Sequence, residues 1–330
     1  MSTRPQDLPI RFTLDGQEIL ANAGETILQA AQRYGIEIPH LCYTDGLRAD
    51  GNCRACVVEI EGERTLAPSC NRRPSEGMVV RAASARARHS QKMVVEMLLA
   101  DAGDGHYTLT SELNDWAQKL NVGQPRFRAR VQPTADLSHP AIAVNLDACI
   151  QCTRCLRACR EEQNNDVIGY AHRGGNSAIV FDLEDPMRAS SCVACGECVQ
   201  ACPTGALAPA GGVAMVEADK TVESVCPYCG VGCQLTYHVK DNRILQVKGR
   251  DGPANLSRLC VKGRYGFDYV HHCQRLTKPL IRRDDAPKQA ELVVDRDNPF
   301  KNFREATWEE AMEKAASGLL AIKEEHGNKA

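Results

Sequence analysis

The pattern of apolar and polar positions at the start of the chain predicts two strands followed by a helix. The strands cover residues 10–14 and 17–21, and Asp15-Gly16 between them predicts a turn. From about residue 25 to residue 34 the apolar side chains recur at helical spacing, and Gly35 ends the helix. The chain therefore opens with strand, turn, strand and helix.

After residue 56 the pattern changes from strands to helices. Residues 57–60 and 64–67 predict a second hairpin around Glu61-Gly62. The segment 124–140, which contains several Pro and Arg residues, predicts a solvated linker, although its arginines could also contact a partner. Between residue 82 and this linker, helical spacing produces two apolar stripes, formed by Met93, Val94, Met97 and Leu98 and by Leu113, Trp116 and Leu120.

The second half of the chain predicts further strands and turns. A strand at residues 142–144 precedes two hairpins, whose turns are expected at Gly174-Gly175 and at Asp241-Asn242. Near the end, after a charged loop, Thr307 and Glu310 predict a capping box. The helix that follows has an apolar face formed by Trp308, Ala311, Ala315, Leu319 and Ile322. The overall expectation is an α+β chain of several small domains.

Composition changes this picture mainly through its 17 cysteines among 330 residues. A disulfide scaffold is usually a short secreted chain, whereas the start MSTRPQDLPIRF has neither an apolar signal core nor a twin-arginine signal. We therefore expect a cytoplasmic protein whose thiols are free to bind metal. A net charge of -2 gives no reason to expect nucleic acid. The longest apolar stretch, residues 93–100, is interrupted by Glu96 and is too short for direct membrane insertion.

Two cysteine runs in the middle of the chain have the spacing C-x2-C-x2-C-x3-C. In two-cluster ferredoxins, three cysteines of such a run hold one [4Fe-4S] cluster and the fourth reaches across to the other cluster. The spacing therefore predicts two crossed ligand sets: Cys149, Cys152, Cys155 and Cys202 for one [4Fe-4S] cluster, and Cys192, Cys195, Cys198 and Cys159 for the second. Zinc is the alternative, because paired C-x2-C motifs also bind zinc.

Two further sets of four cysteines flank these runs. Cys42, Cys53, Cys56 and Cys70 are spaced C-x10-C-x2-C-x13-C, and Cys226, Cys229, Cys233 and Cys260 are spaced C-x2-C-x3-C-x26-C. A four-cysteine zinc site is again the alternative for each set. Cys273 is left over, and we expect it to be a non-ligand thiol of the kind that is commonly buried.

The spacing of the first set resembles the [2Fe-2S] domain of the large iron-sulfur subunit of respiratory complex I and of related NAD-linked dehydrogenases, and the strand and helix order resembles a β-grasp ferredoxin. In complex I relatives the next, helical region carries a cluster held by one histidine and three cysteines. Because no cysteine lies between Cys70 and Cys149, we expect that cluster to be absent and His89 and His106 to be ordinary histidines.

The fourth set, continued by Val261-Lys262-Gly263-Arg264, resembles the N-terminal [4Fe-4S] domain of the molybdenum or tungsten bis-pterin oxidoreductases. Together with HPAIAVNLDACIQCTRC, SSCVACGECVQACPTGAL and LCVKGRYGFDYVHH, the domain order resembles the α subunit of cytoplasmic NAD-dependent formate dehydrogenases over almost the whole chain. In that family the lysine after the last ligand lies between the cluster and a pterin, so the resemblance makes Lys262 the candidate cofactor-binding residue.

The resemblance implies five segments. They are a β-grasp [2Fe-2S] domain at 1–81, a helical linker region at 82–139, a two-cluster [4Fe-4S] ferredoxin domain at 140–218, a small [4Fe-4S] domain of the molybdopterin oxidoreductase type at 219–280, and the truncated start of a catalytic domain at 281–330. The catalytic cysteine or selenocysteine is expected downstream of Ala330, so this chain should contain no catalytic residue.

The implied function is electron transfer. Electrons from formate oxidation at a Mo- or W-bis-molybdopterin guanine dinucleotide centre would pass through three [4Fe-4S] clusters and one [2Fe-2S] cluster towards a flavin- and NAD-binding β subunit, and the resemblance also allows a further small [2Fe-2S] subunit. The alternative is a non-catalytic four-cluster electron carrier of a complex I-like or hydrogenase-diaphorase assembly. A third hypothesis is that the chain is a scaffold protein stabilised by zinc.

Overall fold

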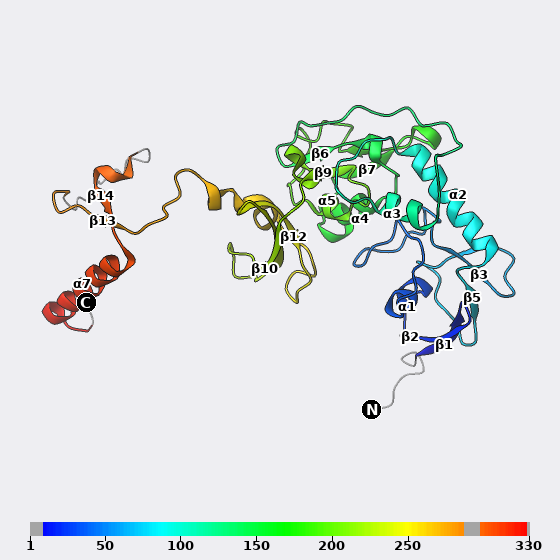
Figure 1. The fold of residues 1–330 in the computed structure, drawn as a ribbon, viewed down its shortest axis with the longest axis horizontal. Helices are drawn as coiled ribbons and strands as arrows, with labels where there is room; N and C mark the ends of the chain where they lie inside the picture. Colours follow the sequence, from blue (N-terminus) through cyan, green and yellow to red (C-terminus); the bar gives the residue numbers. More distant parts are fainter. Residues whose placement is uncertain (1–8, 287–297, 329–330) are drawn as a thin grey trace. The chain divides into compact units, whose positions relative to one another are not determined.

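The structure, a computed structural model, describes residues 9–286 and 298–328 (Figure 1). It divides into two compact units, Met1–Phe267 and Asp268–Ala330. Most of the N-terminal stretch on which the expected compartment rests, and residues 287–297 of the expected charged loop, lie outside the described residues.

The first unit begins with a five-stranded sheet of order β2-β1-β5-β3-β4. The predicted first hairpin is confirmed as β1 (Ile10–Leu14) and β2 (Gln17–Ala21), which pair antiparallel. The predicted helix is α1 (Ile27–Arg33), whose N-cap Thr26 forms a capping box with Gln29. The buried side chains of these elements form an apolar core that includes Phe12, Leu14 and Leu28.

The second predicted hairpin needs a correction. β3 (Val57–Ile60) is present, but its partner β4 covers only Ala67–Pro68, two residues that pair with Val57 and Val58. The other end of β3 pairs with β5 (Val79–Arg81), a strand that the sequence pattern did not predict. Because β5 supplies the hydrogen-bonding partners of residues 59 and 60, residues 64–66 are left in a loop.

The helical region contains α2 (Ala85–Asp101) and α3 (Glu112–Lys119). The α3 stripe is confirmed, because Leu113 and Leu120 are buried. The α2 stripe was partly wrong, since Met97 is 43% exposed and the buried face runs through Gln91 and Val95 instead. The Gln91 amide donates to the carbonyl oxygens of Val57 (3.0 Å) and Ala82 (3.2 Å), and these bonds turn that face of α2 towards the sheet.

The linker that follows α3 is tied to α2 by Glu96. The Glu96 carboxylate accepts hydrogen bonds from the backbone N–H (2.9 Å) and the guanidinium (2.7 Å) of Arg126, and the side-chain bond lowers the pKa of Glu96 to about 2.

We expect Glu96→Gln to increase trypsin cleavage after Arg126 and Arg128 on the order of fivefold, because the charged acceptor is lost. Glu37→Gln, which removes the exposed ion pair with Lys119, is the control. Unchanged cleavage in Glu96→Gln would contradict the conclusion that Glu96 holds the linker against α2.

The central part of the first unit consists of two small sheets and two short helices. β6 (Ile142–Val144) pairs with β9 (Leu207–Pro209), and β7 (Ile168–Ala171) pairs with β8 (Ala178–Phe181). The predicted strand at 142–144 and the predicted turn at Gly174-Gly175 are confirmed. The helices and turns between these strands are η2 (Leu146–Ala148), α4 (Arg154–Arg157), the π-helical turn η3 (Ala158–Glu162), η4 (Gly174–Asn176) and α5 (Glu197–Ala201), and η5 (Ala210–Met215) follows β9.

The last part of the first unit is an antiparallel sheet of order β10-β11-β12, formed by Lys220–Val225, Gln234–Lys240 and Arg243–Gly249. The predicted turn is confirmed, with Asp241 and Asn242 both at positive φ, as a two-residue hairpin turn requires. The short helix α6 (Val261–Tyr265) follows the sheet, and η6 (Gly266–His271) begins in this unit and ends in the second.

The second unit contains a two-stranded sheet and one long helix. β13 (Leu280–Arg282) pairs with β14 (Phe303–Glu305), which follows η7 (Pro299–Lys301), and α7 covers Trp308–His326. Thr307 caps α7 by accepting a hydrogen bond from the Glu310 N–H, but the Glu310 carboxylate pairs with Arg304, so only the Thr307 half of the predicted capping box is confirmed. Cys273, expected to be buried, is exposed. In the described ranges 9–286 and 298–328, no helix has both the length and the apolar character needed to cross a bilayer.

Candidate metal centres

The two central cysteine runs line two separate apolar cavities. The first cavity contains Cys149, Cys152 and Cys155 of the first run together with Cys202 of the second, beside Ile150, Ile179 and Leu207. The second cavity contains Cys192, Cys195 and Cys198 together with Cys159, beside Val167, Phe181 and Met187. The structure therefore brings together three cysteines of one run with the last cysteine of the other run.

The backbone builds both cavities in the same way. Gln151 and Ala194, two residues after the first cysteine of each run, are left-handed, with φ of 56° and 55°. Their N–H groups donate to the sulfur atoms of Cys149 (3.4 Å) and Cys192 (3.3 Å). Hydrogen bonds of this kind, from protein N–H to ligand sulfur, are one means by which a protein tunes an iron-sulfur cluster.

Burial favours the neutral form of most of the thiols in these cavities. It raises the pKa of Cys149 to about 11 and that of Cys152 to about 12, and it raises the pKa values of Cys155 and Cys198 well above the usual range. A cationic metal group would reverse this preference, because it stabilises thiolates. Four thiols around an apolar cavity are a donor set that fits a [4Fe-4S] cluster.

The first cysteine set lies beside the N-terminal sheet, with Cys56 and Cys70 in the core formed by the sheet and α1, and Cys42 and Cys53 in a neighbouring apolar cluster. Cys42, Cys56 and Cys70 are buried and Cys53 is partly buried. Hydrogen bonds with Cys53 and then Cys70 lower the pKa of Cys42 to about 2, and a hydrogen bond with Cys70 lowers that of Cys56. The same bonds raise the pKa values of Cys53 and Cys70. The four thiols are thus in mutual contact, an arrangement that fits the compact [2Fe-2S] group.

The fourth cysteine set is more open. Cys226 is buried, Cys233 is partly buried, and Cys229 and Cys260 are exposed. Burial, and then proximity to the other three cysteines, raises the pKa of Cys233, so the four thiols gather in one place. Lys262 lies on α6 with its side chain exposed. Within the part of the chain that the structure describes, no group of three or more His, Cys, Asp or Glu side chains is arranged to hold a single metal ion.

Sequence reasoning missed a group of buried arginines between the cysteines. Arg154 and Arg157 lie on the four-residue helix α4, and Arg264 lies on α6. Arg154 pairs with Glu112 (2.7 Å) and donates to the carbonyl oxygen of Leu41 (3.3 Å). A signal was present, because arginine inside a run of buried ligands is unusual unless it is paired.

The two histidines that were expected to be ordinary are both exposed. His106 lines an open cavity of about 540 Å³ in the helical region, next to Tyr107. The Tyr107 hydroxyl donates to Asp147 (2.5 Å), and this hydrogen bond raises the pKa of Tyr107 to about 12. Asp147 immediately precedes the first ligand loop, so this contact attaches the helical region to that loop.

Three protein-family models match the chain. The 2Fe-2S iron-sulfur cluster binding domain matches residues 7–85, the ferredoxin-like domain of NADH-quinone oxidoreductase subunit 3 matches residues 139–208, and the molybdopterin oxidoreductase Fe4S4 domain matches residues 219–272. These matches favour iron-sulfur clusters over the zinc alternatives. The matched ranges lie close to the expected segments 1–81, 140–218 and 219–280, whose ends stay predictions.

Relatives and a solved structure agree with these matches. The chain is 36% identical to a subunit of NADH-quinone oxidoreductase from Rhizobium meliloti, over 83% of this chain and 33% of that protein. It is 26% identical to "Putative formate dehydrogenase SH0748" of Staphylococcus haemolyticus, over 96% of this chain and 35% of that protein. The crystal structure of an NAD+-reducing [NiFe]-hydrogenase in the H2-reduced state matches with a TM-score of 0.56 and 28% identity, over 61% of this chain and 88% of that chain.

The fold and the four cysteine sets define an iron-sulfur protein of mixed α and β structure, with [2Fe-2S] and [4Fe-4S] ferredoxin-type domains. The chain belongs to the oxidoreductase family of iron-sulfur electron-transfer subunits that includes those of complex I, formate dehydrogenases and NAD-reducing hydrogenases. It spans about a third of the length of the curated relatives it matches.

Proposed function

We propose that this chain is the electron-transfer part of the α subunit of an NAD-dependent formate dehydrogenase. The four cysteine sets would hold one [2Fe-2S] cluster and three [4Fe-4S] clusters. The proposed sets are Cys42, Cys53, Cys56 and Cys70 for the [2Fe-2S] cluster, and Cys149, Cys152, Cys155 and Cys202, then Cys192, Cys195, Cys198 and Cys159, then Cys226, Cys229, Cys233 and Cys260 for the [4Fe-4S] clusters.

The observation that carries the proposal is the pair of apolar cavities, each lined by four thiols in crossed sets. Cys42 of the first set and Cys152 of the first cavity also belong to one apolar cluster, together with Leu41, Ala55 and Ile150. Neighbouring redox groups embedded in one apolar cluster are suited to exchange electrons, because little solvent has to reorganise around them.

The chemistry of the proposal is balanced. Formate would give CO2, one proton and two electrons at a Mo or W bis-pterin centre, and a flavin-bearing partner subunit would pass two electrons and one proton to NAD+. When bound, the iron-sulfur clusters would supply one-electron steps between these two reactions. Lys262 would lie between the Cys226 cluster and a pterin, and residues 281–330 would begin the pterin-binding domain.

A second candidate is a non-catalytic electron carrier in a hydrogenase-type or complex I-type assembly. The likeness to the NAD+-reducing hydrogenase supports it, because the match covers 88% of that chain. The protein of Staphylococcus haemolyticus supports the formate dehydrogenase instead, since its match extends over 96% of this chain.

The test is the metal content and the electron donor of the protein purified anaerobically from its own cells. We expect about fourteen iron atoms per chain with acid-labile sulfide. Bound Mo or W, together with reduction of the clusters by formate, would support the dehydrogenase. Reduction by NADH but not by formate, with no Mo or W, would support the carrier. Zinc in place of iron would overturn both.

A further inference from the structure

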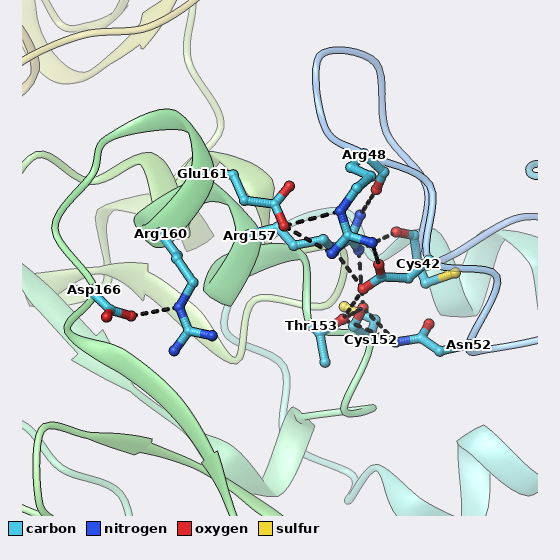
Figure 2. A network of polar contacts seen from close by, with 10 residues as sticks. Cys42, Arg48, Asn52, Cys152, Thr153, Arg157, Arg160, Glu161 and Asp166 are labelled. Atoms are coloured by element: carbon cyan, nitrogen blue, oxygen red, sulfur yellow. Dashed lines mark hydrogen bonds and ion pairs between the residues drawn. The ribbon is translucent and has the colours of Figure 1, made fainter.

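A buried arginine lies between the first two cysteine sites. Arg157 has a relative exposure of 0% and lies on α4, between Cys155 and Cys159. Its guanidinium donates to the carbonyl oxygens of Cys42 (2.5 Å) and Cys152 (3.2 Å), as Figure 2 shows. Cys42 and Cys152 belong to different cysteine sets, so one side chain joins the backbones of two candidate ligand loops.

The charge of Arg157 is balanced by Asp50, which is partly buried. Its Nε lies 3.1 Å from a carboxylate oxygen of Asp50, which also pairs with the exposed Arg48 (2.8 Å) and accepts a hydrogen bond from Thr153 (3.2 Å). Removing either partner of a buried ion pair leaves the other charge uncompensated. Arg157 and Asp50 can therefore be changed separately to alter the charge at this position in opposite directions.

A second buried arginine occupies the equivalent place between the last two cysteine sites. Arg264, 4% exposed, follows Cys260 by four residues and donates to the carbonyl oxygen of Cys195 (2.8 Å). It also pairs with the buried Glu197. Gly196 leaves room for this approach, because a Cβ atom there would lie 2.2 Å from the Arg264 Cδ. At both junctions a buried arginine therefore donates to the backbone carbonyl of a candidate ligand cysteine, although the two arginines come from different segments of the chain.

We infer that Arg157 and Arg264 are positioning residues for electron transfer, Arg157 between the Cys42 and Cys149 clusters and Arg264 between the Cys192 and Cys226 clusters. Each arginine fixes the carbonyl of a ligand in the adjacent loop and places a positive charge where reduction adds negative charge. Net charge and hydrogen bonding around a cluster are the protein's means of setting its potential. The inference rests on the ligand sets proposed above.

Redox titration of the cluster-loaded protein, followed by EPR, tests the first junction. In Arg157→Met we expect the one-electron reduction equilibrium constants of the Cys42 cluster and of the Cys149 cluster to fall about tenfold, which corresponds to ~59 mV. The Cys226 cluster should not change. Arg157→Lys should restore most of the potential of both clusters, because it keeps the positive charge. Hydrogen exchange at the amides of residues 41–43 should still be faster than in the unaltered protein, because lysine lacks the forked guanidinium donor that can bind two carbonyl oxygens at once.

The matched control is Arg160→Gln. Arg160 lies three residues further along the chain, in η3, is exposed and pairs with Asp166 (2.5 Å), so its loss should move no cluster potential (Figure 2). Asp50→Asn provides a second test should Arg157→Met lose iron. It keeps the arginine and removes the opposing charge, so the same two potentials should rise.

Arg264→Met tests the second junction and should act on the other pair of clusters. The potentials of the Cys192 and Cys226 clusters should fall, while the [2Fe-2S] potential stays constant. Equal shifts of all four clusters in either arginine variant, or unchanged potentials in both variants and in Asp50→Asn, would overturn the inference. Absence of iron-sulfur EPR signals from the unaltered protein would instead overturn the proposed ligand sets on which the inference rests.

Discussion

Replacing Cys159 with alanine is expected to remove the [4Fe-4S] cluster of the opposite run. Cys159 is the last cysteine of the first run, but it lines the cavity that contains Cys192, Cys195 and Cys198. The variant should therefore hold about ten iron atoms per chain instead of about fourteen, because a cubane that lacks one thiolate ligand is lost. Iron analysis and quantitative EPR measure this loss.

The reciprocal variant and a control complete this experiment. Cys202→Ala should remove the cluster of Cys149, Cys152 and Cys155, whose cavity it shares. Cys273→Ala should retain all the iron, because Cys273 is exposed and lies outside the four sets. If Cys159→Ala removed only the cluster of the first run, the crossed ligand sets would be wrong.

Removing the iron is expected to unfold the central part of the first unit while the N-terminal sheet persists. The apolar core of the central part includes Cys155, Cys159 and Cys198, with Cys149, Cys192 and Cys202 packed against it. Its helices α4 and α5 have only four and five residues, too few to be stable by themselves. Where metal ligands form much of the core, the free energy of metal binding is also free energy of folding.

The N-terminal sheet has a different kind of core. It consists mainly of aliphatic and aromatic side chains on β1, β2 and α1, such as Phe12, Ile19 and Leu28. After oxidative removal of the iron with a chelator at neutral pH, hydrogen exchange should accelerate by at least about 100-fold in β6–β9 and should change little in β1 and β2. Equal loss of protection in both regions would show that the sheet also depends on the clusters.

Local rules predicted much of the fold and most of the candidate site. The turns at Asp15-Gly16, Gly174-Gly175 and Asp241-Asn242 lie where the sequence placed them, because turn residues act on their immediate neighbours. The grouping of the cysteines into sets also followed from spacing alone. Ligand spacing is a local property, since it reflects the loop that must surround a cluster.

The predictions of the fold that were wrong involve contacts between segments that are distant in the sequence. β5 is only three residues long and forms a strand because it pairs with β1 and β3. The residues of β5 do not by themselves predict this pairing. The buried face of α2 was misplaced because the side-chain NH2 group of a polar residue, Gln91, donates to the backbone carbonyls of Val57 in β3 and of Ala82, which follows β5. A pattern of apolar residues cannot anticipate a buried polar side chain whose partners lie up to 34 residues away.

By itself the sequence predicted the four cysteine sets, the hairpins β1–β2, β7–β8 and β11–β12, and the family to which the chain belongs. Only the tertiary structure decided which sets are neighbours and which side chains lie between them. Arg157 meets the carbonyl of Cys42 across 115 residues of sequence, and Arg264 meets that of Cys195 across 69. Such contacts follow from the packing of whole domains, because a buried charge is tolerated only where several distant segments supply its partners at once.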